Sequence, residues 1–131
     1  MSRTMLAGAL AMALFGGGAA AQGDAAASER AAMQDFFIGT LEIDVPLGSW
    51  SAKRYFSPDH TYREVGSDGT VRGTWAVRDG KVCTTAERPV SGPDRTATYC
   101  NAILGKHAGE QWKDADPVTG NAVFFNLKAG R

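Results

Sequence analysis

Residues 71–87 have the sequence VRGTWAVRDGKVCTTAE, and this stretch decides the fold class. On its first half, small or apolar side chains alternate with polar ones, which is typical of a half-buried antiparallel strand. The Asp79-Gly80 dipeptide that follows is favoured in type I′ hairpin turns. We therefore predict a β-hairpin with strands at 71–78 and 81–87 and with Trp75 facing inward.

Outward from this hairpin, short β-prone segments alternate with turn residues on both sides. Consecutive hairpins without room for crossover helices form an antiparallel up-and-down meander. About eight such strands must close into a small barrel or split into two sheets, and closure removes exposed edges. We predict a mainly β protein with a single barrel domain over residues 39–131, and a two-sheet sandwich is the alternative. The predicted strands are 41–45, 50–56, 61–65, 71–78, 81–87, 96–104, 110–113 and 122–128.

The first residues have the pattern of a signal peptide. Arg3 gives a positive start, an apolar run extends from Met5 to Phe15, and Ala19-Ala20-Ala21 supplies the small residues that precede a cleavage site. The apolar run is too short to span a membrane, which takes roughly twenty residues. We expect residues 1–21 to be removed and the mature chain to be periplasmic or secreted, with no membrane span.

Residues 22–38 are predicted to be a helical segment in front of the barrel. Good helix formers fill 24–37, and Gly39 follows as a stop. Apolar positions such as Ala32 and Phe36 recur at helical spacing, so one face should pack on the strands. We expect a short helix across one mouth of the barrel, and a partly frayed N-terminal segment is the alternative.

Cys83 and Cys100 are the two cysteines of the chain. In an exported protein, two cysteines are expected to form a disulfide. If they lie opposite each other on antiparallel strands, Thr85 faces Thr98 and the connecting loop centres on Ser91-Gly92, where turn residues stand. Closing a loop of this length stabilises the folded state by roughly 3 kcal/mol in the chain-entropy model.

The charge pattern argues against nucleic acid as a partner. The chain has 14 basic and 14 acidic side chains, and loss of Arg3 with the signal peptide leaves 13 basic ones and a formal charge of about −1. These charges are interspersed along the sequence. A nucleic-acid-binding protein usually carries a basic stripe that follows the phosphate backbone.

The sequence has no clear catalytic or metal-binding pattern. His60 and His107 lie in turn-like stretches, and neither has the spacing of a metal ligand set. Nucleophilic catalysis usually needs a base beside a serine or cysteine. We therefore expect a protein that is not an enzyme and that uses neither a metal nor another cofactor.

One predicted strand breaks the expected alternation. In 50–56, the face that carries Trp50 and Phe56 also carries Arg54, so a charged side chain is either buried or two aromatic rings are exposed. The interior of an eight-stranded barrel holds either packed side chains or one small ligand. If a pocket exists, we predict that Arg54 contacts an anionic group, Tyr62 forms hydrogen bonds and Trp75 is a stacking wall.

Several motifs resemble those of small exported proteobacterial proteins of unknown function that are described as lipocalin-like or calycin-like. The similarity covers about Gly39 to Cys100 and implies a β-barrel fold. The motifs are Gly39-Thr40-Leu41, Tyr55-Phe56-Ser57-Pro58-Asp59, Gly73-Thr74-Trp75 and Asp79-Gly80-Lys81-Val82-Cys83.

Ser91-Gly92, Tyr99 and Trp112-Lys113 are similar to features of the periplasmic C-type lysozyme inhibitors. That resemblance places the inhibitory serine at Ser91. Our first hypothesis is an exported, non-enzymatic binding module that takes a small apolar or amphipathic ligand in the barrel mouth. The alternative is a protein-interaction module, or an inhibitor of a cell-wall hydrolase such as lysozyme, that acts through loop 88–95 with Ser91, Gly92 and Arg95.

Overall fold

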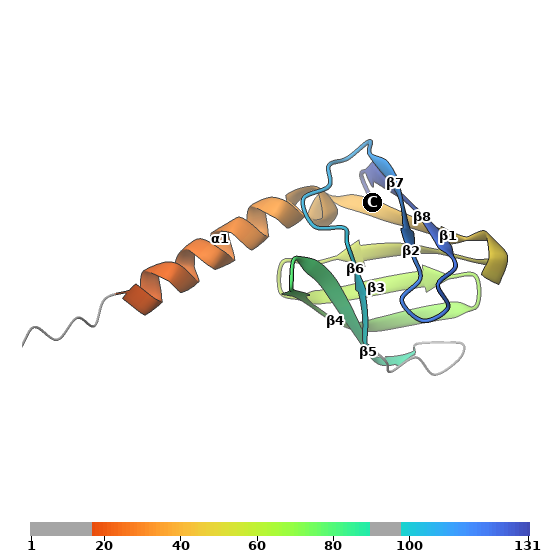
Figure 1. The fold of residues 1–131 in the computed structure, drawn as a ribbon, viewed down its shortest axis with the longest axis horizontal. Helices are drawn as coiled ribbons and strands as arrows, with labels where there is room; N and C mark the ends of the chain where they lie inside the picture. The colour runs from red at the N-terminus through yellow and green to blue at the C-terminus, as the bar shows by residue number, and fades with distance from the viewer. Residues whose placement is uncertain (1–16, 90–97) are drawn as a thin grey trace, which may run out of the picture.

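A computed structural model describes residues 17–89 and 98–131, with side chains from residue 23 to 87 and from 98 onward. One helix precedes eight strands, and a single turn of 3₁₀ helix, Pro46–Gly48, links the first two strands (Figure 1). The elements are α1 (Gly17–Ile38), β1 (Gly39–Val45), β2 (Trp50–Phe56), β3 (Thr61–Gly66), β4 (Gly69–Arg78), β5 (Lys81–Pro89), β6 (Thr98–Asn101), β7 (Gln111–Ala115) and β8 (Ala122–Ala129).

The strands form one antiparallel sheet that curls into a nearly closed barrel. Their order is β6-β5-β4-β3-β2-β1-β8-β7, so the meander runs from β1 to β6 and the last hairpin, β7–β8, joins it through β1. The sheet therefore has its two edges at β6 and β7. Next to these edges, the Ala102 backbone N–H donates a hydrogen bond to Asp114 Oδ2 at 3.4 Å. The predicted barrel is confirmed, and the sandwich alternative is wrong.

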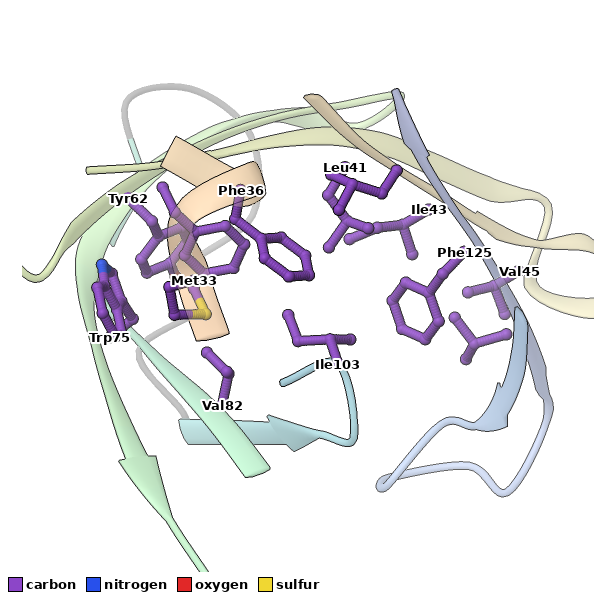
Figure 2. Close-up of a cluster of buried hydrophobic side chains, with 13 residues drawn as sticks. Met33, Phe36, Leu41, Ile43, Val45, Tyr62, Trp75, Val82, Ile103 and Phe125 are labelled. Atoms are coloured by element: carbon purple, nitrogen blue, oxygen red, sulfur yellow. The ribbon is translucent and has the colours of Figure 1, made fainter. Parts of the chain in front are cut away.

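Helix α1 ends against one end of the barrel and projects away from it toward its N-terminus (Figure 1). Met33 and Phe36 are fully buried among the strands, where Phe36 packs edge-on against Phe56 of β2 (Figure 2). The predicted packing of one helix face is thus confirmed, but the predicted bounds of 22–38 are too short because the helix begins at Gly17. Ala19, Ala20, Ala21 and Gln22 have high helix propensity, and the docked end of α1 supplies a nucleus from which the helix extends past the less favourable Gly23.

Where α1 meets β1, the backbones approach too closely for any side chain. A Cβ at Gly39 would lie 2.6 Å from the carbonyl oxygens of both Asp35 and Lys128. Gly39 therefore marks the end of the helix, as predicted, because of close packing. Residues 17–21 of α1 fall inside the predicted signal peptide; residues 1–16 lie outside the described part of the chain, so cleavage stays a prediction.

The inward side chains of the strands form one buried cluster with Met33 and Phe36 of α1, and this cluster extends as far as Val45 at the end of β1 (Figure 2). Trp75 is buried on β4 as predicted, and the apolar face of β8 is buried through Val123, Phe125 and Leu127. Ile103 follows β6 and is fully buried in the same cluster.

A disulfide joins Cys83 of β5 to Cys100 of β6. The predicted register is confirmed, because Thr85 lies opposite Thr98 and their hydroxyl oxygens are 2.7 Å apart. The centre of the connecting loop lies outside the described residues. Within the described residues, no helix has the length and apolar character needed to cross a membrane.

Candidate functional site

A cavity of about 340 Å³ lies at the end of the barrel away from α1. Strand β1 starts beside the helix and ends at Val45, which lines this cavity together with Val71 of β4 and Ala86 of β5. Trp50 and Tyr99 add aromatic surface. A smaller cavity of about 70 Å³ shares part of this lining and extends the open space toward β8. The walls thus combine apolar and aromatic side chains with a set of polar ones, as small-molecule sites do.

Arg54 and Glu64 form a buried ion pair on this cavity. They are cross-strand neighbours on β2 and β3, and their exposed fractions are only 8% and 6%. Arg54 Nε and Nη2 both donate to Glu64 Oε1, at 2.9 and 2.5 Å. Neither side chain makes another hydrogen bond within the described residues, so Arg54 Nη1 and Glu64 Oε2 are left for a group in the cavity.

Such a pair is energetically unusual. Taking both charges out of water costs several kcal/mol per ion, and their mutual attraction often does no more than offset that cost. An apolar pair of similar volume would stabilise a barrel interior at least as well. The pair therefore points to a role other than stability, and it supplies the cavity with a donor and an acceptor side by side.

Tyr62 stands next to this pair on β3. Burial raises the pKa of its hydroxyl above the usual value near 10, while the nearby Arg54 charge opposes the shift. The Arg54 guanidinium lies 5.7 Å from the centre of the Tyr62 ring. The phenol is consequently uncharged at neutral pH and can both donate and accept a hydrogen bond.

The turn between β7 and β8 forms part of the cavity rim through Asp116, Val118, Thr119 and Asn121. Asp116 Oδ1 accepts hydrogen bonds from the backbone N–H groups of Val118 and Thr119, at 2.7 and 3.2 Å. These bonds fix the shape of the turn. The Val118 side chain is 68% exposed, so the rim offers an apolar residue at the cavity entrance.

Of the predicted pocket residues, Arg54 and Tyr62 line this cavity and Trp75 does not. Trp75 is 3% exposed near α1, where its Nε1 donates to the Ser57 carbonyl at 2.9 Å and His60 stacks on its ring at 4.3 Å. Trp50 and Tyr99 supply the aromatic surface instead.

Glu64 was missed at the sequence level, although it lies two residues after Tyr62 and therefore on the same face of β3. That spacing was the available signal. The alternative site, with Ser91, Gly92 and Arg95, lies outside the described residues.

The two histidines contact carboxylates of α1 rather than the cavity. His60 Nε2 lies 3.1 Å from Glu29 Oε1, and His107 Nδ1 lies 3.4 Å from Asp35 Oδ2. Both imidazoles are at least half exposed. Among the residues with described side chains, no group of three His, Cys, Asp or Glu comes together as a metal site would require.

Comparisons of the chain with protein-family models, curated proteins and solved structures find no match, so its function must be argued from the cavity and its residues.

Proposed function

We propose that this protein is an exported, non-enzymatic binding module that takes one small amphipathic ligand into the barrel cavity. The observation that carries the proposal is the Arg54–Glu64 pair, which lies on a cavity with apolar and aromatic walls and, among the described residues, keeps polar atoms without a hydrogen-bond partner. The signal-peptide pattern and the disulfide support export, because disulfides persist in oxidising compartments.

The size and walls of the cavity support a small ligand with an apolar body. Its volume of about 340 Å³ is at the lower end of the range for small-molecule sites. Val45, Val71 and Ala86 would contact an alkyl chain, and Trp50 and Tyr99 would flank it. Such walls favour a ligand that is apolar along most of its length, because removing apolar surface from water is favourable.

The charges favour a ligand whose polar group is neutral. A unit charge about 4 Å from either member of the pair gains or loses about 4 kcal/mol at an effective dielectric constant of 20. Attraction to one member and repulsion from the other nearly cancel, so the desolvation cost of an ionic ligand is left without compensation. Glu64 takes the place of the anionic group that we predicted as the partner of Arg54. The polar group of the ligand is therefore an uncharged amide or hydroxyl.

Three probes with the same alkyl chain test this proposal: octanamide, octanoate and octylammonium. Calorimetric titration of the oxidised protein should give the tightest binding for octanamide, by about tenfold, which corresponds to 1.4 kcal/mol. Ala86→Phe places a ring in the cavity and should abolish binding, whereas Ala129→Phe on the exposed end of β8 should not. Failure of all three probes to bind, or equal binding by both variants, would contradict the proposal.

Charge-switch variants test the role of the pair. Glu64→Gln leaves Arg54 as the buried charge on the cavity and should shift the preference to octanoate, with Asp116 at the rim engaged by the backbone N–H groups of Val118 and Thr119. Arg54→Met leaves the Glu64 carboxylate and should shift it to octylammonium. Near-UV circular dichroism identifies the conditions under which each variant is folded. An unchanged order of the three probes in both folded variants would rule out the pair as the recognition element.

A further inference from the structure

A second groove, of about 430 Å³, lies on the outer surface of the barrel over β2, β3 and β4. Its lining includes three arginines, Arg63, Arg72 and Arg131, together with Tyr55 and Thr61. Arg63 follows Tyr62 on β3, and successive side chains of a strand point to opposite faces. The Arg63 side chain is therefore on the other face of the sheet from Tyr62 and the interior cavity.

Two of the arginines are placed directly against each other. Arg63 of β3 and Arg72 of β4 are cross-strand partners in the register, and both side chains are exposed. Like charges in directly opposed positions destabilise a sheet. Within the described residues, neither arginine has an ion-pair partner that would offset this repulsion.

Tyr55 organises the guanidinium groups around the groove. The Arg63 guanidinium lies 4.9 Å from the centre of the Tyr55 ring, and that of Arg131 lies 5.9 Å from it. Arg131 Nη2 also donates a hydrogen bond to the Phe56 carbonyl. Stacking and hydrogen bonding reduce the freedom of these long side chains, so less entropy is lost when they bind an anion.

The charge of the groove matches a dianion. Glu87 is the acidic side chain in its lining, so the three arginines leave two positive charges in excess. This excess stands out in a chain whose formal net charge is zero. Arginine forks bind planar or tetrahedral oxyanions with paired hydrogen bonds, and a phosphoryl group offers three oxygens and nearly two negative charges.

We infer that this outer groove is a binding site for a phosphoryl group, carried either by a soluble phosphomonoester or by a lipid headgroup. Arg63 and Arg72 supply the main hydrogen bonds from adjacent strands, and Arg131 closes one side of the groove over Tyr55. Its arginines are distinct from the Arg54–Glu64 pair of the interior cavity, although Tyr62 borders both.

Titration of the ¹⁵N-labelled protein with glucose 6-phosphate, followed through the arginine Nε–H signals, tests the soluble form, and glucose is the uncharged control. Co-sedimentation with phosphatidylcholine vesicles, with and without phosphatidic acid, tests the lipid form. Shifts at Arg63 and Arg72 with glucose 6-phosphate, or sedimentation that requires phosphatidic acid, support the site and identify its source. Neither response, or an equal response to glucose, overturns it.

Matched variants separate the groove from the overall charge of the protein. Arg72→Gln should weaken binding about tenfold or more, because it removes charge-assisted hydrogen bonds. Arg78→Gln removes the same charge from an exposed position at the end of the same strand, outside the groove, and should leave the affinity unchanged. Equal losses in the two variants would show that any reduction in positive charge suffices and would overturn the site.

Discussion

Breaking the Arg54–Glu64 pair from one side should cost far more stability than removing it from both sides. Removal of one partner of a buried pair leaves an uncompensated charge and typically costs 3–5 kcal/mol. Because both side chains are more than nine-tenths buried yet border a cavity, we expect about 3 kcal/mol for Arg54→Met and for Glu64→Leu. The double variant should lie within about 1 kcal/mol of the parent, since the apolar replacements fill a similar volume.

Urea unfolding followed by tryptophan fluorescence, with the disulfide intact, measures these free energies if the m-value is unchanged. The exposed pair Lys128–Glu42, whose charged atoms are 2.8 Å apart, is the matched control, and its coupling energy should stay below about 1 kcal/mol. Additive losses at Arg54 and Glu64 would refute the argument, because they would show that the two charges do not compensate each other.

The other predictions concern backbone, covalent and titration effects. Gly73→Ala should destabilise the protein by about 1–3 kcal/mol or more in urea unfolding, because its Cβ would lie 2.0 Å from a backbone oxygen of β5. Replacing Cys83 and Cys100 by alanine should cost about 3 kcal/mol in the same assay. Because the pKa of Tyr62 is raised in the folded state, the folded protein keeps the phenol proton to a higher pH than the unfolded chain does. The stability that this gives is complete below the usual pKa near 10 and is lost as the pH rises through the pKa of the folded state. Tyr62→Phe should therefore reduce the loss of stability above about pH 10.

Much of the barrel was predictable because its signals are local. The Asp79-Gly80 turn and the period-two pattern around Trp75 specify the β4–β5 hairpin within one short stretch. The register of Cys83 with Cys100 followed from spacing and turn residues alone. The start of α1 was not predictable in the same way. Once the docked C-terminal end has nucleated the helix, adding further residues at its N-terminal end costs little, and no single residue marks where it begins.

The site was predictable only in part, because an inward-facing residue can either pack in the core or line the cavity. Arg54 breaks the alternation of apolar and polar residues in β2, which made it a candidate from the sequence. Its partner Glu64 is identified only by the pairing of β2 with β3. Trp75 and Tyr62 both face inward, and sequence does not tell which end of the barrel is filled. Trp75 packs against Phe37 of α1, with ring centroids 5.9 Å apart, whereas Tyr62 borders the cavity.

The most direct test of the account is an NMR titration of the oxidised protein with octanamide, in which intermolecular contacts are mapped onto the barrel. If the interior cavity holds the ligand, nuclear Overhauser effects should connect the octanamide methyl group with Val71, and the Arg54 Nε–H signal should shift in the parent protein but not in Ala86→Phe. Contacts confined to the outer face of the sheet, or no response at Arg54, would contradict the claim that the interior cavity is the binding site.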